Sequence, residues 1–198
     1  MKLALLIIIL FSFISQAQSL HVTGEIKVDS TFSCIDPIQP DSLEFGINEI
    51  CHSGNYIEIR LKTSILATSE LIILSFNNNE WIAEKYYPEY KTKGRKVIST
   101  SMMKMVKNDS AGLLMSIFDS LKSKHLFLLP DQRTVTKRTI NESVIIVSDG
   151  VLYTITYKVG NLYRRYHYGN PEIFAKHYPK EPEYKQVTAI IQLLDNIF

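Results

Sequence analysis

The sequence predicts an α+β fold in which antiparallel β-meanders pack against two main amphipathic helices. Between residues 56 and 168, short stretches of alternating apolar and polar residues recur with Asn- and Gly-containing turns between them, as half-buried antiparallel strands require. Two other stretches, 109–124 and 182–196, carry apolar residues at helical spacing instead. One apolar sheet face and two apolar helix stripes together favour a two-layer arrangement.

The first residues have the pattern of a secretory signal peptide. Lys2 precedes an almost purely apolar stretch from Leu3 to Ile14, and Ser15 and Ala17 suit a small-residue cleavage site. The apolar stretch is shorter than the roughly 20 residues that a membrane-spanning helix needs. We therefore expect residues 1–17 to be a signal peptide and the mature chain to reside in the periplasm or outside the cell, with no membrane span after cleavage. An uncleaved N-terminal anchor is the alternative.

The mature chain divides into an irregular segment and one domain. Residues 18–55 hold several Pro and Gly residues and no long periodic run, so we expect an extended N-terminal segment. Residues 56–198 are long enough to form a single α+β domain. The two cysteines, Cys34 and Cys51, would enter an oxidising compartment, which favours a disulfide between them. Two separate buried thiols are the alternative.

Four strands are predicted in the first half of the domain. They cover residues 56–62, 71–76, 81–87 and 97–105. The run Asn77–Asn79 makes a turn between the second and third strands, because Asn tolerates left-handed backbone geometry. We expect Pro88 to end the third strand, since proline cannot donate a ladder hydrogen bond.

The middle of the chain predicts a helix over residues 109–124, with Asn108, Asp109 and Ser110 as candidate caps. The apolar run from Leu126 to Leu129 favours a short strand that Pro130 stops. The basic residues that follow, between positions 133 and 138, are interpreted as part of a solvated loop.

Three further strands are predicted over residues 144–148, 151–159 and 162–168. The dipeptides Asp149-Gly150 and Gly160-Asn161 are two-residue hairpin turns, so they fix the register. If Val159 pairs with Leu162, Ile155 lies opposite Tyr166 and Tyr153 lies opposite Tyr168. The face that carries Ile155 and these tyrosines should be the core, and the face that carries Tyr163, Arg165 and His167 should be partly solvated.

Two helices close the chain. Asn170 and Pro171 suit the first positions of a short helix that ends near Tyr178. The last helix covers residues 182–196 and has an apolar stripe at nearly ideal spacing, formed by Val187, Ile190, Ile191, Leu194 and Ile197. We expect that stripe to lie on the sheet.

Composition and motifs exclude several function classes. The net charge is only +2, which gives no electrostatic footprint for nucleic acid. The sequence contains no glycine-rich phosphate loop, dinucleotide fingerprint, zinc helix, EF-hand or nucleophile elbow. We therefore predict no cofactor, no metal site and no catalytic constellation.

One strand has the composition of a binding surface. Tyr163, Arg165 and His167 alternate on one face of strand 162–168, and aromatic and arginine side chains dominate binding hot spots. The sequence thus favours an exported, non-catalytic binding or envelope-associated module whose partner is a protein or an envelope ligand. An ordinary edge strand, with charges that block unwanted pairing, accounts for the same residues. The alternative function is a secreted hydrolase without a recognised motif, in which Asp149 or Glu172 would act with His167. A purely structural envelope protein is a further alternative.

Overall fold

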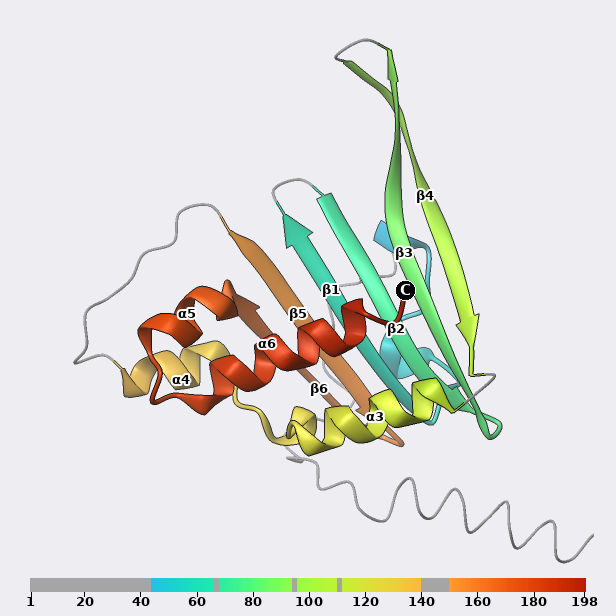
Figure 1. Cartoon of the computed structure of the whole chain (residues 1–198). Coiled ribbons are helices and arrows are strands. Elements are labelled where there is room, and N and C mark those ends of the chain that lie inside the picture. The colour runs from blue at the N-terminus through green and yellow to red at the C-terminus, as the bar shows by residue number, and fades with distance from the viewer. Residues whose placement is uncertain (1–43, 66–67, 94–95, 110–111, 140–149) are drawn as a thin grey trace, which may run out of the picture.

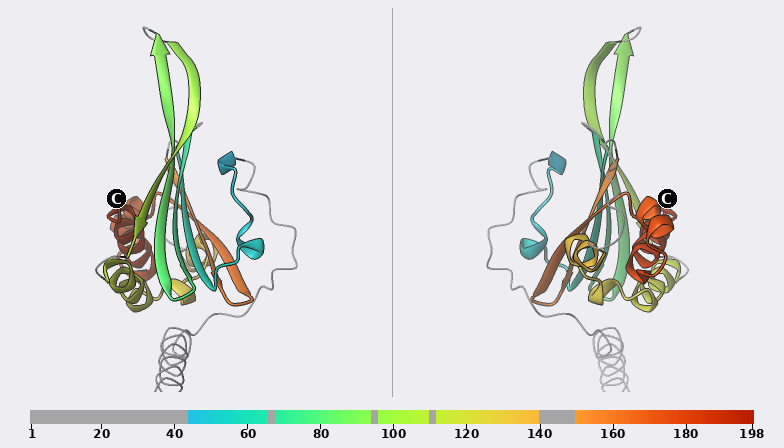
Figure 2. Two further views of the ribbon diagram at one scale, coloured as in Figure 1. Left: turned by 90° about the vertical axis from the view of Figure 1, so that its right-hand side faces the viewer. Right: turned by 90° about the vertical axis from the view of Figure 1, so that its left-hand side faces the viewer.

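The structure is a computed structural model that describes residues 44–65, 68–93, 96–109, 112–139 and 150–198. It confirms the α+β fold, with a six-stranded antiparallel sheet that carries its helices on one face (Figures 1 and 2). The predicted signal peptide, Cys34, the predicted strand 144–148 and Asp149 lie outside the described residues.

The strand order in the sheet is β4-β3-β2-β1-β5-β6, with every neighbouring pair antiparallel. The strands are β1 (Ile57–Ile65), β2 (Thr68–Asn77), β3 (Glu80–Lys93), β4 (Lys96–Asn108), β5 (Val151–Val159) and β6 (Leu162–Gly169). The first four form a meander, and the chain then crosses the helical face to place β5 beside β1 (Figure 1). The edges of the sheet are therefore β4 and β6.

Four α-helices and two short 3₁₀ helices complete the described part of the fold. They are η1 (Ile50–His52), α3 (Leu113–Ser123), η2 (Leu126–Leu128), α4 (Gln132–Arg138), α5 (Pro171–His177) and α6 (Pro182–Asp195). The predicted helices over 109–124, 170–178 and 182–196 are confirmed as α3, α5 and α6, whereas α4 replaces a predicted loop. The Asp109 carboxylate accepts hydrogen bonds from the backbone amides of Leu114 and Met115, as its predicted capping role requires.

The predicted hairpin register between β5 and β6 is confirmed. Val159 pairs with Leu162, Ile155 with Tyr166 and Tyr153 with Tyr168. Gly160 occupies the turn with a φ of 57°, a left-handed conformation that glycine adopts without a steric cost. The side-chain faces of both strands follow from this register.

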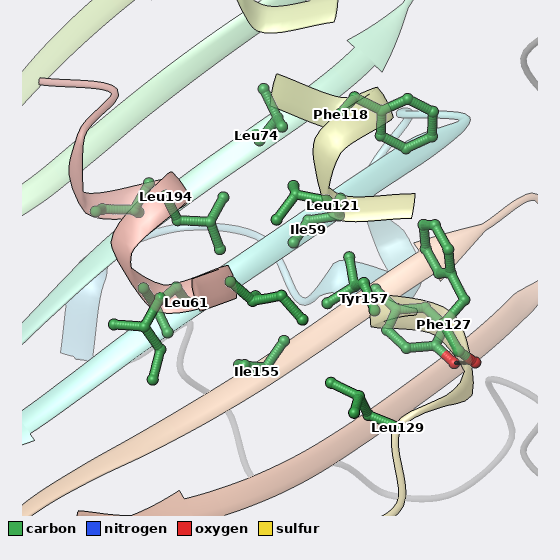
Figure 3. Packing of buried hydrophobic residues seen from close by; sticks show 14 of the residues in the cluster. Ile59, Leu61, Leu74, Phe118, Leu121, Phe127, Leu129, Ile155, Tyr157 and Leu194 are labelled. Carbon is green, nitrogen blue, oxygen red and sulfur yellow. Dashed lines mark hydrogen bonds between the residues drawn. The ribbon is translucent and has the colours of Figure 1, made fainter. Parts of the chain in front are cut away.

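The main core lies between the sheet and the helices (Figure 3). Ile59, Leu61 and Leu74 of the sheet meet Leu121 of α3 and Leu194 of α6, and all of these side chains are buried. The whole predicted stripe of α6 is buried against the sheet in the same way. Burial of this apolar surface is the main stabilising contribution to the fold.

Three buried tyrosines of the sheet hold the chain between α3 and α4. The hydroxyls of Tyr157, Tyr166 and Tyr168 donate to three backbone carbonyls within residues 126–130, those of Phe127, Leu126 and Pro130. The strand predicted over 126–129 is wrong: this segment forms η2, because its carbonyls accept from tyrosines across the core instead of from a neighbouring strand. Burial raises the pKa of Tyr166 and Tyr168, so both phenols stay protonated as donors.

Pro88 does not end β3, which continues to Lys93. The pairing of β3 with β2 stops at Tyr86, while its pairing with β4 continues through Pro88 opposite Met102. The backbone nitrogen of Pro88 faces the side of β3 where β2 no longer pairs with it. The absence of an N–H group at Pro88 therefore removes no hydrogen bond between strands. Beyond this point β3 and β4 project as a two-stranded arm (Figures 1 and 2), formed by residues 88–93 and 96–102.

The face of the sheet opposite the helices is partly covered by residues 44–56, which we call the strap (Figure 2). Phe45 of the strap packs on a small apolar cluster with Leu71, Ile73 and Tyr86. Hydrogen bonds from charged side chains of the sheet hold the remainder of the strap in place. The guanidinium of Arg60 donates to the carbonyl of Asn48 at 2.7 Å, and the Lys158 ammonium donates to the carbonyl of Ser53 at 2.7 Å.

A buried ion pair lies under the strap. The Arg60 Nε donates to Glu58 Oε1 at 2.5 Å, and the two side chains are only 5% and 2% exposed. The other carboxylate oxygen of Glu58 accepts from the side-chain amide of Asn55 at 2.6 Å. Burial also lowers the pKa of Lys158, against the opposing attraction of the Glu58 carboxylate. These buried charges all serve to hold the strap on the sheet.

Cys51 lies half-buried in η1, next to the buried Ile50, and is not a free thiol. Because Cys34 is outside the described residues, the Cys34–Cys51 disulfide stays a prediction. We expect the oxidised mature protein to be more stable than its reduced form by about 3 kcal/mol, since the bridge would restrict the unfolded chain. Urea unfolding with and without reductant measures this. A Cys34→Ser/Cys51→Ser variant that is insensitive to reductant is the control, and equal stability of the oxidised and reduced wild-type protein would contradict the disulfide.

Candidate functional site

The outer edge of β6 is fastened to the start of α4. The Asp131 carboxylate caps α4 by accepting from the amide of Arg133, and its second oxygen accepts from the backbone amide of His167 at 3.1 Å. The side-chain oxygen of Gln132 accepts from the amide of Gly169 at 2.6 Å. These contacts place one face of α4 beside His167.

A cavity of about 880 Å³ lies at this junction. We call it the β6 cavity. Its lining, among the described residues, consists of Asp131, Gln132, Arg133, Thr136, Lys137, Leu152 and His167. A volume of this size is within the range of pockets that hold small ligands or the side chains of a partner.

The cavity wall is cationic. Arg133 and Lys137 are four residues apart on α4, so their side chains lie on the same helix face, and both are exposed. In the described part of the chain neither of them forms an ion pair. Among the lining residues that the structure describes, the one carboxylate, that of Asp131, already accepts from two backbone amides. The positive charge of the wall is therefore available to an incoming anion.

The three residues of the predicted binding patch share one face of β6 but differ in exposure and contacts. His167 is exposed and lines the β6 cavity, with its Nδ1 2.9 Å from the hydroxyl of Thr154. Arg165 is half-buried and donates from Nε to the hydroxyl of Thr156 at 3.3 Å. Tyr163 is only 8% exposed and pairs with Lys158. Of the three, His167 is the residue that the structure places at the cavity.

The residues of the hydrolase alternative are not brought together in the described part of the chain. Glu172 lies in the first turn of α5 on the helix-covered side. Burial is the main cause of the raised pKa of Tyr153, and the negative charge of Glu172 raises that pKa further. His167 projects from the other face of the sheet. No cluster of three or more His, Cys, Asp or Glu side chains that could hold a metal ion occurs among the described residues.

Sequence reasoning missed Arg133 and Lys137 as site residues. Their spacing of four was visible, but it has meaning only on a helix, and residues 132–138 contain a single buried apolar side chain, Val135. The signal that could have identified the helix is Asp131, a favoured N-cap residue directly before the segment.

Comparisons with protein-family models, with curated proteins and with solved structures find no match to this chain. Over the stretch of the chain that the structure describes, no helix is sufficiently long and apolar to cross a membrane.

Proposed function

We propose that the protein is an exported, non-catalytic module that binds a partner carrying an anionic group, and that the β6 cavity receives this group. The observation that carries the proposal is the cationic wall of the cavity, where Arg133 and Lys137 are exposed without an ion-pair partner in the described chain. Export rests on the predicted signal peptide over residues 1–17.

The chemistry of the wall indicates what it can bind. Arginine recognises carboxylate, sulfate and phosphate groups through paired N–H donors, and lysine adds a point charge. Leu152 offers an exposed apolar side chain beside the charges. A protein or envelope ligand with acidic groups next to apolar ones fits this combination. The hydrolase alternative has less support, since Glu172 and His167 lie on opposite sides of the sheet.

Site-directed photo-crosslinking in the native host tests the proposal. A photo-reactive residue at position 137 should capture one reproducible partner, whereas the same residue at exposed position 176 on α5 should not. Equal capture at both positions, or none at position 137 in a well-exported protein, would contradict the assignment of the site.

The double variant Arg133→Ser/Lys137→Ser should weaken binding at the cavity by at least about tenfold, because each charge-assisted hydrogen bond contributes about 1.5–3 kcal/mol. The measurement is an NMR titration of the mature protein with a short polyglutamate peptide, following the amides of residues 132–137 and 167. The matched control is Lys176→Ser/Lys180→Ser, which removes the same charge from another exposed surface. If the control variant loses as much affinity, the binding is a net-charge effect and not a property of the site.

A further inference from the structure

We propose that β4 is a dimerisation edge, at which a second copy of this chain adds its own β4 in antiparallel orientation to form one continuous sheet. This inference is independent of the β6 cavity, which lies at the opposite edge of the sheet. It rests on the exposure, the backbone direction and the charge pattern of β4.

β4 is a long edge strand with exposed apolar side chains. It has 13 residues, and an edge strand of this length presents unpaired backbone donors and acceptors. Six apolar side chains of β4 and the adjoining arm are between 39% and 57% exposed: Tyr90, Val97, Met102, Met103, Met105 and Val106. Methionine is common at association surfaces because its flexible side chain adapts to a partner.

Two lysines of β4 that could discourage pairing, Lys104 and Lys107, have partners within the chain. Lys104 forms an ion pair with Glu84 at 2.5 Å, and this bond is the main cause of its raised pKa. Lys107 donates to the carbonyl of Ile197 at 2.9 Å. The charges of Lys104 and Lys107 are therefore compensated within the chain, while the apolar residues of β4 stay exposed.

The hydrogen bonds of β4 with β3 show which groups point outward. The amide of Asp109 donates to the carbonyl of Trp81, so the odd-numbered residues from Lys107 back to Ser99 face β3 as well. Before Ser99 a bulge interrupts this alternation. The even-numbered residues, among them Met102, Lys104 and Val106, present their amides and carbonyls to the open side. Two antiparallel copies can exchange hydrogen bonds only if even-numbered residues lie opposite even-numbered residues.

One such register pairs the regular part of the strand. With Met102 opposite the Met102 of the second copy, Ser99 lies opposite Met105, so residues 99–105 of the two copies pair with each other. In this register Lys104 lies opposite Thr100 and does not face another lysine. A shift that placed Lys104 opposite itself would set like charges against each other, which destabilises a strand pair. The strand is thus self-complementary about Met102.

Sedimentation of the mature protein over a concentration series tests the proposal, and we expect the mass to double as the concentration rises. Met102→Lys and Met102→Glu should each remain monomeric, because each would place two like charges opposite each other. Mixing the two variants should restore a dimer, since Lys then lies opposite Glu. Ile173→Lys, at an exposed apolar residue of α5, is the matched control and should dimerise as the wild type does.

Hydrogen exchange gives a second readout. The amides of Thr100, Met102 and Lys104 should be protected only in the dimer, whereas those of Met103 and Met105 should be protected by β3 in monomer and dimer alike. Three results would overturn the proposal. The protein could stay monomeric at all concentrations, or the mixture of the two Met102 variants could fail to form a dimer. The third is a β4 edge that is occupied by another protein while the chain alone stays monomeric.

Discussion

Replacing Arg60 with methionine is expected to lower the free energy of unfolding by about 3–5 kcal/mol, because the substitution leaves the Glu58 carboxylate buried without its counter-charge. The two side chains are 5% and 2% exposed, so water cannot replace the lost partner. The contact from Arg60 to the carbonyl of Asn48 is lost at the same time, and this loosens the strap. Urea unfolding of the variant and the wild type measures the difference.

Two controls separate the charge effect from loss of a contact. Glu58→Leu/Arg60→Met removes both charges and should recover most of the lost stability, because apolar residues of similar volume can replace a buried pair. Lys62→Met removes a more exposed cation of the same strand face, paired with Glu44, and should cost no more than about 1 kcal/mol. An Arg60→Met variant no less stable than Lys62→Met would show that the Glu58 charge is not buried.

Replacing Tyr157, Tyr166 and Tyr168 together with phenylalanine is expected to cost roughly 3–6 kcal/mol. Each hydroxyl donates to a backbone carbonyl of residues 126–130, and its removal leaves that buried carbonyl without the bond, at a cost of about 1–2 kcal/mol each. The rings and their packing remain, so the loss reports the hydrogen bonds alone. Tyr90→Phe, at an exposed position on the arm, is the control and should change stability by no more than about 0.5 kcal/mol.

The same variant should also change the alkaline limit of the fold. Burial holds the pKa of Tyr166 and Tyr168 above the ordinary value of about 10, so the unfolded chain loses these protons first as the pH rises. Above about pH 10 the unfolded state therefore binds fewer protons than the folded state, and wild-type stability falls with pH. The triple variant should show a shallower fall over that range. Parallel slopes for the two proteins would contradict the burial of these phenols.

The elements that local pattern determines could be predicted from the sequence. The β5–β6 register follows from a two-residue turn and strict alternation, and α6 follows from one stripe of apolar residues at helical spacing. In both cases each residue can be assigned to a face without knowledge of its neighbours in space.

The elements that depend on distant contacts could not be predicted. Leu126–Leu128 has the composition of a strand, but tyrosines from β5 and β6 bind its carbonyls and leave it as a 3₁₀ turn. Pro88 would interrupt most strands, and it is accommodated here only because β2 has already ended its pairing with β3.

The candidate site could be predicted only in part, because part of it also depends on distant contacts. His167 was identified by the composition of its own strand, whereas Arg133 and Lys137 reach it through α4, a helix of seven residues with little amphipathic pattern. What brings α4 to β6 is the pair of backbone amides bound by Asp131 and Gln132. Such a side-chain contact with a strand edge leaves no periodic signal in the sequence.

The attachment of α4 to β6 also limits how far the sheet could grow. A strand edge can propagate into a filament only if each added copy offers another open edge. The amides of His167 and Gly169 point outward from β6 and are already bound by Asp131 and Gln132, so a new strand cannot pair along the full length of β6. An assembly that starts at β4 would have β6 at both ends, and it would stop at two subunits instead of extending into a fibre.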